Sequence, residues 1–495
     1  MKDKIQTFKA YIKEKKYLLA TIEVLQWELE TLAPKQGQEY LSEVLAYMSM
    51  KDYELSTSEA FQTLVSELLE KKSSFDLLLQ KELEEVAEEI EKMKKIPAEE
   101  YRDYAELCAK NQGVWEEAKQ KNDFSLVEGN LTKIFDYNRK FANYLRKEEK
   151  TLYDVLLRDY EKGMTCEKLD VFFASLKAEI VPLLHNIQKT KKKHFSFLTA
   201  PVPKETQKQF CCFLAEYLGF DFERGILAES EHPFTLNINK KDVRITTKYI
   251  EHLPFSSIFS TIHETGHALY EQQIGEELLS SLLGSGGSMG LHESQSRFWE
   301  NVIGRSLTFW KELYPQLQKK FPSLEHISLE EFYEAINQVE ASFIRTEADE
   351  LTYCLHIMLR YELEKSLIEG NLSVKELPKA WKEKMREYLG VEVSNNQEGV
   401  LQDVHWFAGL IGYFPSYALG NVYASQLFHS MKQDLDLTEY SQETIRKIRL
   451  WLGENIHQYG KCKTTTELIR EITGEDLNPS YYIQYLKEKY EALYF

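Results

Sequence analysis

The chain has 495 residues, of which 43% are hydrophobic, and a formal net charge of −18 at pH 7. This charge argues against nucleic-acid binding, which depends on neutralising phosphates with Lys and Arg, and it offers no basic patch to an anionic membrane. The length would suit two or three domains, but the 12 prolines and 22 glycines form no linker between the halves. We therefore predict a single domain over residues 1–495.

The first 200 residues carry no recognisable motif and show mainly helical periodicity. Long amphipathic helices rich in Leu, Glu and Lys are predicted over residues 1–30, 39–72, 75–95, 99–120 and 130–160. The acidic runs within them are typical of solvated helix faces. We expect residues 1–200 to form a wall or lid of a cleft, and residues 201–495 to bind metal and substrate.

The clearest strand pattern lies just before the middle of the chain. Hydrophobic and polar residues alternate over 234–238 and 243–247, with a short polar turn between them, which predicts a β-hairpin. Its edge could accept an extended peptide, although a purely structural role fits the pattern equally well. The whole pattern predicts a mainly α fold, a large two-lobed helical body around a deep cleft, with a small β-sheet or hairpin.

The most informative stretch is His263-Glu264-Thr265-Gly266-His267. Apolar spacing after Pro254 predicts a helix here, and residues i and i+4 of a helix share a face, so the two histidines can bind one metal ion. Zinc lowers the pKa of a bound water to about 7, and a carboxylate beside it can take the proton while hydroxide attacks a carbonyl. The stretch therefore predicts a zinc peptidase in which Glu264 is the general base.

Such a site needs a third protein ligand and one open position. A glycine-rich loop over 284–290 leads into a second helical pattern over 292–301, so the chain can return beside the histidines. Glu293 and Glu300 share a helix face, and spacing alone leaves either as the ligand. His292 is a third candidate, pointing about 100° away from Glu293.

Further motifs flank these two helices. In chain order they are H-P-F at 232–234, D-x-R-x-T at 242–246, I-R-x-x-A-D-E-x-T-Y at 344–353, G-x-x-Q-D-x-H-W at 399–406 and G-Y-F-P-S-Y-A-L-G-N at 412–421. Together with H-E-x-x-H and the H-E-S-Q-S-R of 292–297, they resemble the M32 family of metallocarboxypeptidases, the thermostable-carboxypeptidase type. Ser416 stands where that family more often has threonine, which is a minor departure.

The resemblance implies a helical zincin with His263, His267 and Glu293 as metal ligands and Glu264 as general base. Resemblance, rather than spacing, thus selects Glu293 over Glu300. It also implies one Zn²⁺ per chain, which Co²⁺ or another divalent ion could replace, and a homodimer. The implied activity is hydrolysis of the C-terminal peptide bond of peptides with a free C-terminus.

Hydrolysis needs hydrogen-bond donors aimed at the developing oxyanion. The candidates within the matching motifs are His232, His405, Tyr413 and Tyr417, and the phenols and His405 are favoured because related helical zincins use such groups.

A carboxypeptidase must also recognise a free carboxylate, for which arginine offers a two-pronged donor. Arg345 and Arg244 are the leading candidates, whereas Arg297 lies one helical turn from Glu293 and could hold that ligand by an ion pair. Asp349 and Glu350 could accept hydrogen bonds from the histidine N–H groups, although a helix-to-helix salt bridge would explain either residue nearly as well.

The six cysteines follow no zinc-ribbon or disulfide spacing, and the N-terminus has no apolar signal region, so a cytoplasmic protein with reduced thiols is expected. Residues 406–428 lack charges and are long enough to span a bilayer. Pro415, three glycines and several polar side chains favour a buried or cleft-lining segment instead.

Two other functions share some of these features. A zinc endo-oligopeptidase of related helical fold would have the same metal site and differ only in carboxylate recognition. A non-catalytic scaffold with a structural metal is disfavoured, because structural zinc usually has four protein ligands and no cysteine lies near the motif.

Overall fold

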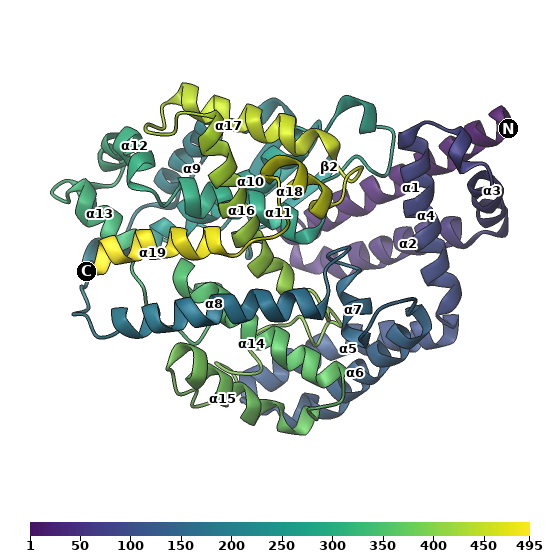
Figure 1. Ribbon diagram of the computed structural model, residues 1–495, viewed down its shortest axis with the longest axis horizontal. Coiled ribbons are helices and arrows are strands. Elements are labelled where there is room, and N and C mark those ends of the chain that lie inside the picture. The colour runs from purple at the N-terminus through teal and green to yellow at the C-terminus, as the bar shows by residue number, and fades with distance from the viewer.

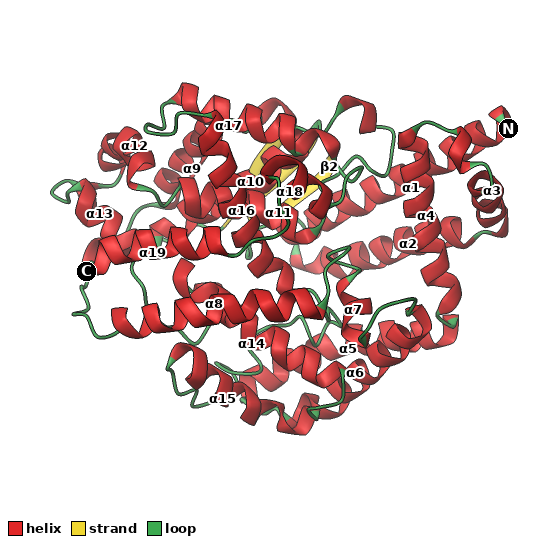
Figure 2. Cartoon of the chain, in the orientation of Figure 1, coloured by secondary structure: helices red, strands yellow, loops and turns green.

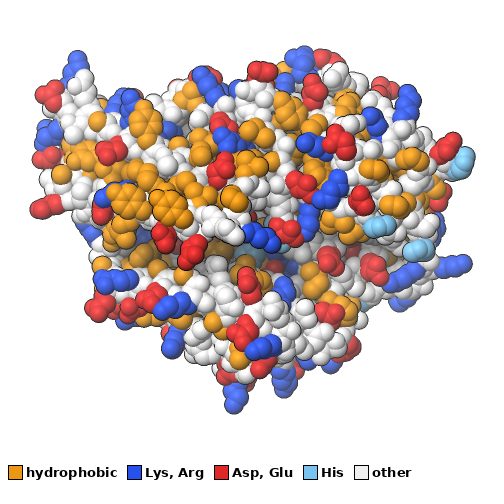
Figure 3. All heavy atoms as spheres, turned by 180° about the vertical axis from the view of Figure 1, so that it is seen from behind, with side chains coloured by type: hydrophobic (Ala, Val, Ile, Leu, Met, Phe, Trp, Pro, Cys, Tyr) orange, Lys and Arg blue, Asp and Glu red, His pale blue; other side chains and the backbone are white.

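The computed structural model describes residues 1–495 and is mainly helical, with one small three-stranded sheet, as predicted (Figures 1 and 2). Seen from behind, a furrow runs across the molecule between an upper and a lower lobe (Figure 3). None of the helices is both long and apolar enough to cross a membrane.

The N-terminal helices form a small bundle at one end of the molecule (Figure 1). They are α1 (Lys2–Thr31), α2 (Gln38–Thr57), α3 (Glu59–Leu69) and α4 (Leu77–Lys95). Their ten-residue hydrophobic core, which includes Phe8, Phe61 and Leu83, is separate from the main core. The single helix predicted over 39–72 is wrong, because the Ser58 side chain accepts a hydrogen bond from the Phe61 N–H and starts a new helix.

The next helices belong to the main core of 101 residues. They are α5 (Ala98–Lys121), α6 (Ser125–Leu145), α7 (Leu152–Leu157), α8 (Cys166–Ile187) and α9 (Lys204–Leu218). The single helix predicted over 130–160 is also wrong, since Thr151 and Asp154 form a capping box that begins α7. Hydrophobic packing thus divides the chain near residue 95. Of residues 1–200 only Leu198 and Thr199 line the cleft described below, so the lid role of that range stays a prediction.

The sheet consists of β1 (Gly225–Glu229), β2 (Thr235–Asn239) and β3 (Asp242–Thr247) in the order β1-β3-β2. The predicted hairpin is confirmed, since β2 and β3 pair antiparallel with Thr235 opposite Ile245. Strand β1 pairs parallel to β3 and was not predicted, because its five residues show little alternation. Helix α10 (Pro254–Gln272) packs against β2 and β3 and carries the H-E-x-x-H stretch.

Helix α11 (Met289–Arg297) crosses α10 at short range and continues into a π-helical turn, Phe298–Ile303. The two helices are closest at Gly266, where a Cβ atom would lie 2.6 Å from the Gln295 carbonyl oxygen, so only glycine permits this crossing. The remaining helices are α12 (Leu307–Lys320), α13 (Leu329–Ile336), α14 (Glu350–Ile368), α15 (Leu377–Leu389), α16 (Phe414–Asp434), α17 (Gln442–Asn455), α18 (Thr465–Thr473) and α19 (Ser480–Tyr494). The uncharged segment 406–428 is a loop followed by the largely buried first half of α16.

Candidate active site

A cleft of about 1180 Å³ contains most of the predicted site residues. One set of lining residues comes from α10, α11 and the π-helical turn. The other comes mainly from the loop 337–349, the start of α14 and Tyr417 of α16. The structure therefore brings the H-E-x-x-H helix and the segment that carries Arg345 to the same cleft.

Three side chains that could together hold a metal ion lie close to one another, and the first and last of them line this cleft: His263, His267 and Glu293. Glu293 Oε2 lies 3.6 Å from His263 Nε2 and 3.5 Å from His267 Nε2. Burial alone would raise the pKa of Glu293, but the Arg297 charge and the imidazoles hold it well below its ordinary value. Burial lowers the pKa of His267 to about 3, so that ring stays neutral, with a lone pair to offer.

The structure gives Glu293 and Glu300 different positions around His263. Glu293 faces Nε2, whereas Glu300 Oε2 lies 2.9 Å from Nδ1 on the far side of the ring. Glu300 is also held by Arg305 at 3.1 Å, and its pKa stays well below the ordinary value because His263, Arg297 and Arg305 outweigh burial. Glu300 is thus placed to orient the histidine, and Glu293 to share its ligand position.

His292 does not face the shared ligand position. Its Nδ1 lies 2.7 Å from His267 Nδ1, and its Nε2 lies 2.8 Å from Glu271 Oε1. Glu271 is buried and also accepts from the Gly286 N–H at 2.9 Å and from the Asn237 side chain. His267 and His263 are therefore supported differently, one through a second histidine and the other directly by a carboxylate.

Glu264 lines the cleft beside the ligands. The Thr235 hydroxyl of β2 donates to Glu264 Oε2 at 2.7 Å and to its backbone oxygen at 3.1 Å. Burial raises the pKa of Glu264, and the Thr235 hydrogen bond and the His263 charge offset part of that rise. The sheet thus holds one carboxylate oxygen of Glu264, and the other has no protein partner.

Glu293 is held from two further directions. Arg297 Nε donates to Glu293 Oε1 at 2.7 Å, and the Ser296 hydroxyl donates to Oε2 at 3.0 Å. Helix α16 packs closely against the Glu293 side chain at Gly420, where a Cβ atom would lie 2.5 Å from Glu293 Cγ. Few positions of the Glu293 side chain are compatible with these contacts.

Of the two arginines predicted to bind a carboxylate, only Arg345 lines the cleft. Asp403 accepts from its Nε at 3.0 Å and from one terminal nitrogen at 2.9 Å, and the Tyr353 hydroxyl lies 3.3 Å from the other. An arginine has five N–H donors, so these three bonds leave two free. Arg244 instead forms a two-pronged bond with Asp242, at 2.9 and 2.8 Å, over the Trp27 ring outside the cleft lining.

The oxyanion candidates are also distributed unequally. Tyr417 lines the cleft, and its hydroxyl lies 3.2 Å from His405 Nε2. The Tyr413 ring packs 5.1 Å from the Tyr417 ring. Burial lowers the pKa of His405 to about 4, so it is neutral at pH 7. His232 is exposed on the loop before β2 and does not line the cleft, so the structure does not group it with the others.

The two predicted acceptors for the histidine N–H groups have other partners, and for Glu350 the alternative interpretation, a helix-to-helix salt bridge, is confirmed. Asp349 is the N-cap of α14 and accepts from the Thr352 N–H at 3.0 Å, while Glu350 forms a buried ion pair with Lys489 at 2.6 Å. Glu300 and His292 occupy the outer positions instead. Spacing could not assign them, because both are also possible ligands by position.

Sequence reasoning missed several supporting residues. Thr235 directly follows the H-P-F motif, and Asp403 lies within the G-x-x-Q-D-x-H-W motif. A role near the site could therefore have been suspected for both. Glu161 lies outside every motif; it is buried and accepts from the hydroxyls of Ser288 and Ser416 at 2.8 and 2.9 Å, which ties the start of α11 to α16. Burial raises its pKa to about 7.

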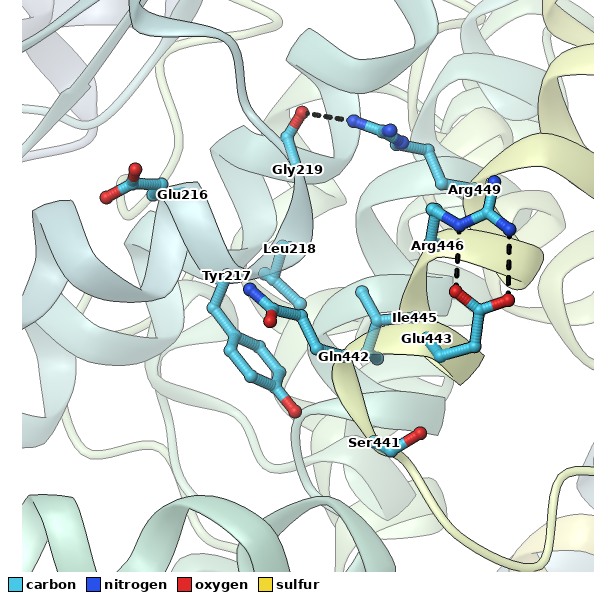
Figure 4. A pocket seen from close by; sticks show the side chains of 10 residues that line it. All are labelled: Glu216, Tyr217, Leu218, Gly219, Ser441, Gln442, Glu443, Ile445, Arg446 and Arg449. Carbon is cyan, nitrogen blue, oxygen red and sulfur yellow. Dashed lines mark hydrogen bonds and ion pairs between the residues drawn. The ribbon is translucent and has the colours of Figure 1, made fainter.

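A second hollow of about 620 Å³ lies on the surface between α9 and α17 (Figure 4). Arg446 binds Glu443 with two bonds of 2.9 Å, and Arg449 donates to the Gly219 carbonyl at 2.8 Å, so both arginines of this hollow have partners. It contains no histidine or cysteine, so we assign it no chemistry.

A histidine pair on one helix, a glutamate on the next and a buried carboxylate beside them in a long cleft define an H-E-x-x-H metallopeptidase. A family model described as "Carboxypeptidase Taq (M32) metallopeptidase" matches residues 7–490. The chain belongs to the M32 family of metallocarboxypeptidases, enzymes that hydrolyse C-terminal peptide bonds.

Curated relatives and solved structures agree with this assignment over nearly the whole chain. Carboxypeptidase 1 of Bacillus subtilis is 43% identical and covers 96% of this chain and 95% of its own. Thermostable carboxypeptidase 1 of Thermus thermophilus is 37% identical, with 99% and 98% covered. The structure of Pyrococcus furiosus carboxypeptidase superposes with a TM-score of 0.93 at 34% identity, covering 98% and 99% of the two chains.

Proposed function

We propose that His263, His267 and Glu293 hold one Zn²⁺ and that the enzyme removes single residues from peptide C-termini. Tetrahedral zinc with bonds of about 2.0–2.1 Å has ligand atoms about 3.3 Å apart. The 3.6 and 3.5 Å separations of Glu293 Oε2 from the two Nε2 atoms support this donor set, and they are the observation that carries the proposal. Co²⁺ or another divalent ion can replace zinc at such a site.

When bound, the metal would acidify water and polarise the scissile carbonyl. Glu264 serves as general base: its oxygen not held by Thr235 takes a proton from the attacking water and then delivers it to the leaving amine. The Thr235 bond keeps the carboxylate oriented toward the cleft during both transfers.

We assign carboxylate recognition to the two free donors of Arg345. Asp403 fixes the guanidinium plane and is itself bound by Arg360 at 2.7 Å, so the fork is rigid before substrate arrives. If His405 Nε2–H donates to the Tyr417 oxygen, the Tyr417 proton remains free for the oxyanion. We assign no contact with the substrate to Tyr413, Arg244 or His232.

The test uses a short peptide and its C-terminally amidated twin, each incubated with and without a chelator and analysed by mass spectrometry. We expect a one-residue ladder from the free-acid peptide alone, lost on chelation and restored by Zn²⁺. Internal cleavage of both peptides would identify an endo-oligopeptidase. An unaffected ladder after complete metal removal would contradict the metal site.

We also propose that the enzyme is a cytoplasmic homodimer that binds neither nucleic acid nor membranes. The six cysteines are all unpaired, which fits a reducing compartment. The α1–α2 region exposes large apolar side chains, among them Leu32 at 70% and Tyr40 at 72%, which could be covered in a dimer. Light scattering combined with size-exclusion chromatography would give the mass of the assembly.

A further inference from the structure

We infer that His292 is a positioning residue: it sets the tautomer and ring orientation of His267, and it links that ring by hydrogen bonds to the carboxylate of Glu271. This inference rests on the proposed function, since it requires His267 to bind a metal ion through Nε2. It assigns a role to the first residue of the H-E-S-Q-S-R stretch, which by position alone was a possible ligand.

The hydrogen-bond chain has only one consistent arrangement of protons. A metal-binding Nε2 uses its lone pair, so the proton of a neutral His267 ring must be on Nδ1, which then donates. The carboxylate of Glu271 accepts, so the proton of its contact with His292 lies on His292 Nε2. His292 Nδ1 is then an acceptor, and it faces the His267 donor at 2.7 Å.

The surroundings of His292 hold its ring in this orientation. Its Nε2 lies 2.8 Å from Glu271 Oε1, and the Tyr270 ring packs 5.1 Å from its centre. Gly286 closes the other side: a Cβ atom there would lie 2.4 Å from a ring carbon of His292. Glu271 is fixed in turn by Gly286 and by Asn237 of β2. The ring therefore cannot turn toward the metal position without breaking several contacts.

Outer hydrogen-bond partners of ligating histidines commonly contribute about 10–100-fold to metal affinity. The His263 ring receives that support directly from Glu300, at 2.9 Å. For His267 the supporting carboxylate is one residue further away, and His292 is the only group that connects them. Removing the connection should therefore weaken metal binding without removing a ligand.

The experiment compares the Zn²⁺ affinity of the full-length wild type, His292→Gln and His292→Leu by chelator competition. Glutamine can present its oxygen to His267 and its amide N–H to Glu271, so it keeps the polarity of the chain, whereas leucine fills space without an acceptor. We expect His292→Leu to lose about 10–100-fold in affinity. We expect His292→Gln to stay close to the wild type, and the visible absorption of the Co²⁺ form to change only in the leucine variant.

Each other outcome has a definite meaning. Wild-type affinity and an unchanged cobalt spectrum in His292→Leu would overturn the inference. Equal, complete metal loss in the glutamine and leucine variants would instead identify His292 as a ligand. Failure of the wild type to bind Zn²⁺ would contradict the proposed metal site itself. Thermal unfolding of the metal-free proteins checks folding, and if His292→Leu does not fold, Glu271→Gln, which removes the charge at the end of the chain, should give the same direction of change.

Discussion

The two sides of the cleft are built in different ways. The metal side lies on α10 and α11, where the backbone is helical and each ligand is held by at least one charged or hydrogen-bonded neighbour. The side proposed to bind the carboxylate lies on irregular segments: Arg345 is in a single 3₁₀ turn, and its partner Asp403 is in the loop before α16. Arg345 is held there by one acid, the partly buried Asp403, which it shares with Arg360.

The comparison indicates that catalysis and recognition can be separated by mutation. Metal-side changes should alter turnover or metal binding for every substrate. Changes on the loop side should alter the preference for a free C-terminus.

The largest effect is expected for Glu264→Gln on the metal side. Loss of a general base costs about 10²–10⁴-fold in turnover, and glutamine cannot accept the proton of water. It keeps the shape of the side chain, and Glu264 is not one of the three grouped ligands, so metal content should be unchanged. Turnover and bound zinc would be measured on the same preparation. Near wild-type turnover would remove Glu264 from the base role.

The second prediction concerns the two glutamates of the metal side. Glu293→Ala removes a ligand and should abolish zinc retention during dialysis. Glu300→Ala removes only the partner of His263 Nδ1 and should weaken zinc binding about 10–100-fold. Both affinities would be measured by chelator competition, with thermal unfolding of the metal-free proteins as the control for folding. A stronger loss in Glu300→Ala would show that the ligand assignment is reversed.

The same contrast explains which parts could be predicted from the sequence. The spacing of His263 and His267 is a local helical property, and the hairpin 234–247 is likewise local, so both could be read directly. Spacing could not choose between Glu293 and Glu300, because their different positions depend on the π-helical turn and on how α11 crosses α10 at Gly266. That crossing is a tertiary property.

The roles of charged residues on the loop side were the hardest to predict. Arg244 and Arg345 lie in equally clear motifs. Only the structure shows that Arg244 is paired with Asp242 and does not line the cleft. Asp349 was expected to contact a histidine, but it caps α14, because the residue before a helix readily accepts from its first N–H groups. The helix breaks at Ser58 and Thr151 are similar cases, in which one capping side chain outweighs continuous helical periodicity.

The third prediction addresses the loop side. Arg345→Lys keeps a positive charge opposite Asp403 but loses the two-pronged geometry. Charge-assisted hydrogen bonds contribute about 1.5–3 kcal/mol, so kcat/KM for a free-acid peptide should fall about 10–100-fold. Bound zinc should stay at the wild-type level. An unchanged kcat/KM for the free-acid peptide would show that Arg345 does not recognise the carboxylate.

The smallest effect is expected for Thr235→Val, which tests whether the sheet contributes to the metal side. The change removes the hydroxyl that donates to Glu264 Oε2 and keeps a branched side chain suited to a strand. One hydrogen bond to a charged group contributes about 1.5 kcal/mol at the lower end of its range, which corresponds to about a tenfold fall in kcat. The loss should be the same for substrates of different length, and zinc affinity and the preference for a free acid should not change.

Thr235→Ser, which restores the hydroxyl, is the matched control and should recover most of the activity. If valine and serine behave alike, Thr235 acts only through packing, and Glu264 is oriented by the helix alone.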